Sequence, residues 1–123
     1  MPDSAALKIL FVENHIRFAA VTVKTFLSAH QVTVVPSIAG ATEFLAAENF
    51  DAVLIDYDLE DGKGDELIHH LQSHSTRPII IAVSSHAPGN RALLEAGADA
   101  VCSKMDFKNI EAVIAKAHFT KPI

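Results

Sequence analysis

The run Ala52-Val53-Leu54-Ile55 constrains the fold most, because four consecutive apolar residues bounded by turn signals are typical of a strand buried on both faces. The run ends abruptly at Asp56, and an acidic, glycine-punctuated segment, residues 57–64, follows it. In an open parallel sheet, ligands bind at the carboxyl ends of the strands. Asp56 is therefore a candidate site residue, although a carboxylate that merely caps the following loop explains this stretch equally well.

Further short apolar runs alternate with stretches of helical periodicity. The runs are Leu7–Val12, Val32–Val35, Ile79–Val83 and Ala100–Ser103. Between and after them, apolar residues recur at three- or four-residue spacing, as on one face of a helix. Strands joined through helices predict parallel pairing with right-handed crossovers. We therefore predict one α/β domain over residues 1–123, a doubly wound five-stranded parallel sheet with helices on both faces.

Local signals predict how the last two helices begin and end. We expect the segment Ser84–Gly89 to be a loop, with Asn90 capping a short fourth helix that stops at a left-handed Gly97. Asp106 is the candidate cap of the last helix.

Charge and composition argue against several classes of protein, among them nucleic-acid-binding, disulfide-rich and membrane-spanning ones. The net charge of −5, with no basic run, gives no electrostatic footprint for direct nucleic-acid binding. The single cysteine, Cys102, excludes an internal disulfide and fits a reducing compartment. The first residues lack the pattern of a signal peptide, and no apolar stretch reaches membrane-spanning length. We expect a cytoplasmic domain without a nucleic-acid or membrane partner.

Polar side chains follow four of the predicted strands at the point where each strand ends. They are Glu13, Asn14, Asp56, Ser84 and Lys104. The carboxyl ends of parallel strands share one edge, so these groups should gather there. Clustered carboxylates repel unless a cation intervenes, and oxygen ligands suit a hard ion such as Mg²⁺. A hydroxyl and a lysine can bind anionic oxygens. The set fits an aspartate that accepts a phosphoryl group.

Over essentially its full length, the chain resembles the receiver domain of two-component response regulators. The matching stretches are residues 8–14, 51–59 with Gly64, 78–84, 95–100 and 103–104. The resemblance implies a flavodoxin-like strand order 2-1-3-4-5. It also implies a cytoplasmic phosphoprotein of a phosphorelay, acting as a switch or relay rather than as an enzyme proper.

The resemblance further implies a role for each site residue. Asp56 would take a phosphoryl group from a histidine kinase or phosphotransfer protein, and the chain would catalyse only its own phosphorylation and dephosphorylation. The groups expected around Mg²⁺ are Glu13, Asn14, Asp56 and the main-chain carbonyl of Asp58. Ser84 and Lys104 would contact the phosphoryl oxygens.

Three positions depart from the family pattern. Two acids usually follow the first strand, whereas Glu13 is followed here by the neutral amide of Asn14, which should weaken Mg²⁺ binding. The switch position, usually aromatic, is Val101, which has no ring to move between buried and exposed rotamers. Met105 follows Lys104 where a proline is usual.

These departures leave a second interpretation open, a receiver-like interaction module that signals without phosphorylation. Asn14, Val101 and Met105 favour it, whereas the retained Asp56 and its phosphate-contacting partners favour phosphorylation. The segment between strand four and strand five is also slightly shorter than in the family. A homodimer through strand five and helices four and five is compatible with the sequence, which does not decide it.

Overall fold

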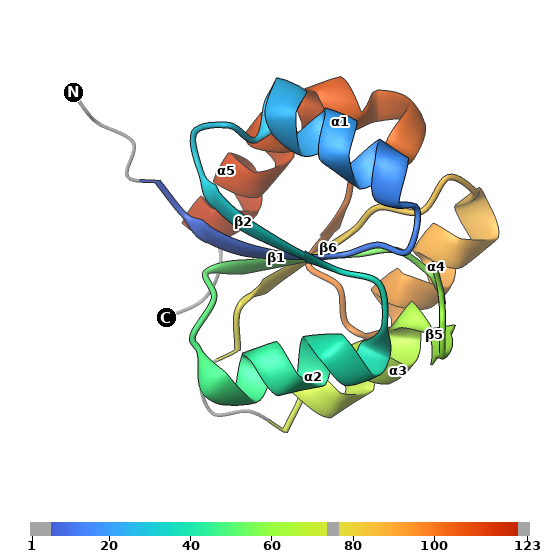
Figure 1. Ribbon diagram of the computed structural model, residues 1–123. Coiled ribbons are helices and arrows are strands. Elements are labelled where there is room, and N and C mark those ends of the chain that lie inside the picture. The colour runs from blue at the N-terminus through green and yellow to red at the C-terminus, as the bar shows by residue number, and fades with distance from the viewer. Residues whose placement is uncertain (1–5, 74–76, 121–123) are drawn as a thin grey trace.

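Five parallel strands form the central sheet in the order β2-β1-β3-β6-β7 (Figure 1). The structure, a computed structural model, describes residues 6–73 and 77–120. The strands are β1 (Lys8–Val12), β2 (Gln31–Val35), β3 (Ala52–Ile55), β6 (Ile79–Ala82) and β7 (Ala100–Val101). In chain order this is 2-1-3-4-5, as the family resemblance implied.

Helices cover both faces of the sheet. They are α1 (Ile16–Phe26), α2 (Ile38–Ala47), α3 (Gly64–Leu71), α4 (Ala87–Ala96) and α5 (Ile110–Thr120), with a 3-10 helix, η1 (Lys104–Asn109), before α5. Helices α1 and α5 lie over one face, and α2 and α3 over the other (Figure 1). The predicted doubly wound α/β fold is thereby confirmed. Within the described ranges, no helix combines the length and apolar character needed to cross a membrane.

Each face of the sheet has its own apolar cluster, because successive side chains of a strand point to opposite faces. Ile9, Phe11, Ala52 and Leu54 join the cluster under α1 and α5, whereas Leu10, Val12, Val53 and Ile55 join the one under α2 and α3. Every residue of β3 is buried, which accounts for the apolar run. Each large side chain buried in this way stabilises the fold by about 1.5–3 kcal/mol.

Helix α4 differs from the sequence prediction at its start. It begins at Ala87 rather than after Asn90, and His86 caps it through Nδ1, which accepts a hydrogen bond from Gly89 N at 3.0 Å. Pro88 lies in the first turn, where its missing N–H leaves no helix bond unmade. The helix therefore has ten residues and is not short. Gly97 ends it with φ of 127°, as predicted.

The segment after β7 also differs from the prediction. Asp106 does not cap the last helix but lies inside η1, with φ of −113° and ψ of 23°. Ser103 caps η1 instead, its Oγ accepting a hydrogen bond from Met105 N at 3.2 Å. Strand β7 accordingly has two residues, and Ser103 is not part of it.

A short antiparallel hairpin was not predicted. Its strands are β4 (Asp58–Leu59) and β5 (Gly62–Lys63), between β3 and α3. Glu66 Oε2 accepts a hydrogen bond from Lys63 N at 3.0 Å and so links the hairpin to the first turn of α3.

Candidate functional site

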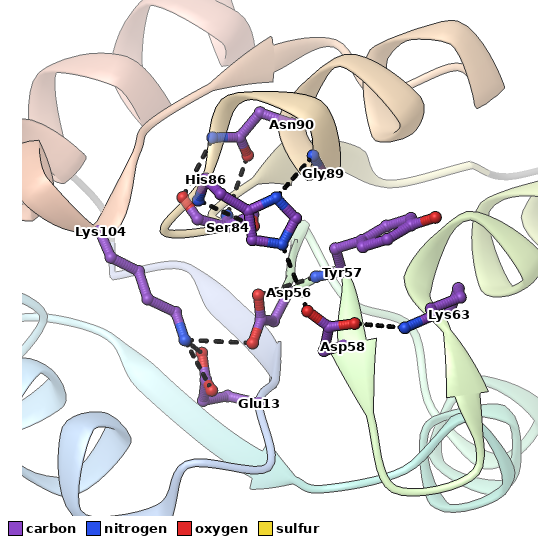
Figure 2. A network of polar contacts seen from close by, with 10 residues as sticks. All are labelled: Glu13, Asp56, Tyr57, Asp58, Lys63, Ser84, His86, Gly89, Asn90 and Lys104. Atoms are coloured by element: carbon purple, nitrogen blue, oxygen red, sulfur yellow. Dashed lines mark hydrogen bonds and ion pairs between the residues drawn. The ribbon is translucent and has the colours of Figure 1, made fainter.

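The carboxyl ends of β1, β3, β6 and β7 bring four of the predicted site residues to one edge of the sheet. Glu13 follows β1, Asp56 follows β3, Ser84 lies after β6, and Lys104 lies after β7 (Figure 2). Main-chain hydrogen bonds between neighbouring strands extend into these positions: Asp56 N donates to Val12 O at 3.0 Å, and Lys104 N to Ser84 O at 3.3 Å. The sheet itself therefore sets the spacing of the site.

Glu13, Asp56 and Lys104 form a buried charge cluster. The Lys104 ammonium lies 2.9 Å from the Glu13 carboxylate and 3.1 Å from Asp56 Oδ2. Glu13 is fully buried, and Asp56 is 6% exposed. The ammonium also lies 4.8 Å from the centroid of the Phe18 ring, whose face attracts a cation. One lysine therefore offsets the repulsion between two carboxylates that water does not screen.

Burial, together with the charge of Asp56, raises the pKa of Glu13 to about 7, against hydrogen bonding and attraction from Lys104, which lower it. Glu13 Oε2 accepts hydrogen bonds from Lys104 and from His15 N, the latter at 3.0 Å. Glu13 Oε1 faces the ammonium but is a buried oxygen without a hydrogen bond. A buried carboxylate oxygen with free lone pairs is a suitable ligand for a cation.

The groups expected around Mg²⁺ divide into two sets. Glu13 and Asp56 share the cluster, whereas the Asn14 side chain is exposed in the bend after β1. The Asp58 side chain is also exposed and pairs with Lys63, which leaves its main-chain carbonyl as the predicted ligand. Among the described residues, no three acidic, histidine or cysteine side chains lie close enough to hold a metal ion. Two carboxylates with main-chain and amide oxygens still fit Mg²⁺, which keeps several waters.

The backbone around Asp56 is closely packed. Asp56 Oδ1 accepts a hydrogen bond from Tyr57 N at 2.8 Å, so Oδ2 is the oxygen that faces Lys104. Gly64 N donates to Tyr57 O at 2.7 Å, and a Cβ at Gly64 would lie 2.2 Å from Asp56 O. A glycine at the start of α3 is therefore needed to let the helix approach the acceptor.

Ser84 is held by Asn90, for which the sequence predicted only the role of a helix cap. Ser84 is 1% exposed, and its hydroxyl accepts a hydrogen bond from His86 N at 3.3 Å. Asn90 Oδ1 accepts from Ser84 N at 2.9 Å, and Asn90 Nδ2 donates to Ser84 O at 3.0 Å. The two bonds form a clamp on the main chain of Ser84. The only sequence signal was a polar residue six positions after Ser84 in a short connection.

A second unpredicted group connects the hairpin to α4. His86 Nδ1 is an acceptor in the helix cap, so its Nε2 carries the proton and donates to Asp58 Oδ2 at 3.3 Å. Hydrogen bonds from Lys63 and then His86 hold the pKa of Asp58 below its ordinary value, and Asp58 raises the pKa of Lys63. The Tyr57 ring meets His86 edge-on, with centroids 5.9 Å apart. These contacts lie beside Asp56 (Figure 2).

Val101, the predicted switch position, is half-buried and lines an open groove between α4 and β7. The groove has a volume of about 430 Å³ and is lined by Ala87, Asn90, Arg91, Leu94, Val101 and Ser103. Of these, Leu94 is a large apolar residue that is 45% exposed. Val101 places no aromatic ring in this groove.

Comparison with known families gives one match that covers most of the chain. Residues 9–115 match the family model of the response regulator receiver domain. No curated protein matches the chain significantly.

Solved structures of similar fold come from several organisms. The receiver domain of a Francisella response regulator is 17% identical, with 92% of this chain and 97% of that chain covered and a TM-score of 0.80. A response regulator receiver domain protein from Methanospirillum hungatei is 20% identical, with 94% and 99% covered and a TM-score of 0.76. The phosphorylated cyanobacterial phytochrome response regulator RcpA is 20% identical, with 87% and 92% covered and a TM-score of 0.70. At these identities the likeness shows a shared fold.

Proposed function

The chain belongs to the response regulator receiver domain family, and from that premise we propose that it accepts a phosphoryl group on Asp56 in two-component signalling. The observation that carries the proposal is the charge cluster, in which Lys104 Nζ lies 3.1 Å from Asp56 Oδ2 in a buried setting. A phosphorylated response regulator, the cyanobacterial RcpA, is among the proteins of similar fold, which supports the same chemistry here.

In the proposed reaction, a carboxylate oxygen of Asp56 attacks the phosphorus of a phosphohistidine on the partner. The bond between phosphorus and the histidine nitrogen breaks, and that nitrogen keeps the electron pair. The product is an acyl phosphate, which water later hydrolyses to inorganic phosphate and the free carboxylate. Because Asp56 is the nucleophile and no other residue forms a covalent bond, the rest of the site contributes positioning and charge neutralisation.

Two side chains serve the phosphoryl oxygens in this proposal. The Lys104 ammonium neutralises charge on one oxygen, at the position where it already faces Asp56. The Ser84 hydroxyl accepts a hydrogen bond from His86 N, so its own proton is free to be donated to a second oxygen. Ser84 lies after β6 and Lys104 lies after the neighbouring strand β7, so the sheet brings both groups to the edge that carries Asp56.

Glu13 and Asp56 would hold Mg²⁺, with the Asn14 amide and the Asp58 carbonyl as further protein oxygens. The ion would supply additional charge neutralisation during transfer. The buried Glu13 Oε1, which makes no hydrogen bond, supports this placement. Replacement of the usual second acid by Asn14 removes a negative ligand and should make the site a weak one.

The expected partner is a histidine kinase or phosphotransfer protein, and two exposed apolar side chains suit its approach. Ile16 begins α1 directly after the β1 end of the site and is 71% exposed. Met105 follows Lys104 and is 81% exposed. A protein bound over this end of the site would bury both apolar side chains, which favours its docking there. We place the phosphoryl donor's docking surface here.

The proposal is tested by incubating the protein with phosphoramidate and Mg²⁺ and measuring intact mass. We expect the added mass of one phosphoryl group on the wild-type chain and none on Asp56→Asn. The matched control is Asp51→Asn, at the opposite end of β3, where the amide can still accept the hydrogen bond from Lys8 N. Labelling that survives in Asp56→Asn would contradict the assignment.

A phosphorylation-independent interaction module is the second candidate function. It is favoured by the charge cluster itself, because Lys104 already neutralises Glu13 and Asp56 without a phosphoryl group. On this alternative the acids hold the fold and the surface binds a partner. Absence of labelling on a folded wild-type chain, from small donors and from a phosphorylated partner alike, would favour it.

A further inference from the structure

Asn90 occupies a position that a helix does not normally give to a buried asparagine. It lies inside α4 and is 8% exposed. Asparagine is a weak helix former because its amide competes for main-chain groups. Here the Asn90 amide binds main-chain groups of another segment, those of Ser84. Its Oδ1 accepts from Ser84 N at 2.9 Å, and its Nδ2 donates to Ser84 O at 3.0 Å. The clamp fixes the position and the orientation of that segment together.

The start of α4 packs directly against the same segment. A Cβ at Gly89 would lie 2.7 Å from Ser84 Oγ and 3.0 Å from Tyr57 Cβ. Ser84 O also accepts a hydrogen bond from Lys104 N. The start of α4 and the main chain of Lys104 therefore both lie close to Ser84, so a displacement of Ser84 would be felt by both.

The clamp also borders the groove at Val101. Asn90 and Val101 line this groove together with Leu94. A valine has no ring that could follow a displaced hydroxyl into or out of the groove. Asn90, in contrast, forms hydrogen bonds with the main chain of Ser84, so it can pass a displacement of Ser84 to α4.

We propose that Asn90 is the positioning residue that couples Ser84 to α4 and so reports phosphorylation of Asp56 to the α4 surface. The inference rests on the proposed function, in which the Ser84 hydroxyl donates to a phosphoryl oxygen. When Ser84 moves toward that oxygen, its N–H and C=O move with it. Because Asn90 holds both groups, α4 and the wall of the groove follow. The Asn90 amide thus passes the displacement of Ser84 to α4, a role that Val101 cannot fill because it has no ring.

The test measures the response of α4 in chains of known phosphorylation. Wild type, Asn90→Ala, Asn90→Asp and Glu95→Ala are treated with phosphoramidate and Mg²⁺, and the labelled fraction is measured by intact mass. Amide chemical shifts of residues 87–96 are then compared before and after labelling. Glu95 is exposed on the same helix and serves as the control.

We expect α4 resonances to shift on labelling in wild type and Glu95→Ala. In Asn90→Ala, the α4 shift per labelled molecule falls about fivefold or more, whatever fraction of the chain is labelled. Asn90→Asp keeps one hydrogen bond and removes the other. Its carboxylate can still accept from Ser84 N, but it has no N–H to donate to Ser84 O and repels that oxygen. Hydrogen exchange at the Ser84 amide should therefore be fast in Asn90→Ala and still protected in Asn90→Asp, with the α4 response reduced in both.

The outcomes distinguish the coupling from the function on which it rests. A labelled wild-type chain whose α4 resonances do not move would overturn the coupling alone. An α4 response of equal size in a fully labelled Asn90→Ala chain would overturn it too. Failure of the wild-type chain to be labelled would overturn the proposed function and the coupling with it. If Asn90→Ala does not fold, a wild-type response in Asn90→Asp is the result that contradicts the clamp.

Discussion

The two sides of the candidate site are held together by different kinds of interaction. On one side, Glu13, Asp56 and Lys104 form a buried cluster of ionisable side chains. On the other, Ser84 is held by neutral hydrogen bonds with Asn90 and His86. The geometry of the charged side depends on where the parallel strands end, whereas the neutral contacts depend on one short connection. We therefore expect substitutions on the two sides to have different effects on stability and on the proposed phosphorylation.

The largest expected effect follows from removing the cation of the charged side. Lys104→Ala leaves Glu13 and Asp56 buried together, and we expect a loss of about 3–5 kcal/mol in the free energy of unfolding at pH 8. The loss should be smaller at pH 6, where Glu13 can retain a proton because its pKa is about 7. Urea unfolding of wild type and Lys104→Ala at pH 8 and pH 6 measures the two losses. The exposed Lys108→Ala is the control, and an equal loss in that variant would contradict the account.

The next effect is a pH dependence that originates at Glu13. Its pKa rises from 4.5 to about 7 on folding, so between these values the native state holds a proton that the unfolded chain has lost. Stability contributed by this group is complete below pH 4.5 and falls as the pH rises toward 7. Relative to Glu13→Gln, wild type should lose on the order of 1–3 kcal/mol across that window. A pH-independent difference between the two chains would show that Glu13 is ionised throughout.

An effect of similar size, on Mg²⁺ affinity rather than on stability, is expected at the metal site. Asn14→Asp restores a negative oxygen and should tighten Mg²⁺ binding by on the order of 1–3 kcal/mol. Tyr57, the single tyrosine of a chain without tryptophan, adjoins Asp56 and offers a fluorescence signal for the titration. Asn109→Asp makes the same change at an exposed position in η1. Equal Mg²⁺ affinity of wild type and Asn14→Asp would place Asn14 away from the ion.

The smallest effect is expected at the switch position. Val101→Phe adds a ring to an open groove of about 430 Å³, and we expect a change in unfolding free energy below about 1 kcal/mol. Labelling of Asp56 should proceed at the wild-type rate. If Asn90 carries the read-out, the α4 response to labelling should also stay the same. A new exchange process in relaxation-dispersion NMR of this variant would contradict that view.

The fold and the charged side of the site could be predicted because they depend on patterns along the chain. Runs such as Ala52–Ile55 and Ile79–Val83 must be buried on both faces, and this requires helices on both sides of the sheet. Once the strands are parallel, their carboxyl ends lie at one edge of the sheet. The proximity of Glu13, Asp56 and Lys104 can therefore be predicted without knowing any side-chain rotamer.

The neutral side could not be predicted, because it depends on local geometry that leaves no periodic signal. Strands β4 and β5 have two residues each, too few to show alternation. Pro88 and Gly89 looked like a loop, although a proline suits the first turn of a helix and the glycine lets α4 approach Ser84. Because α4 begins at Ala87, His86 is its cap, and Asn90 lies inside the helix, where it binds the main chain of Ser84.

The most direct test of the account is to locate the phosphoryl group on the chain. Borohydride reduces an aspartyl phosphate to homoserine, which peptide mass spectrometry can assign to a single residue. After treatment with phosphoramidate and Mg²⁺, we predict homoserine at position 56 and unmodified carboxylates at Glu13 and Asp58. Homoserine at Asp58 with Asp56 unchanged would contradict the central claim that Lys104 and the ends of the strands make Asp56 the phosphoryl acceptor.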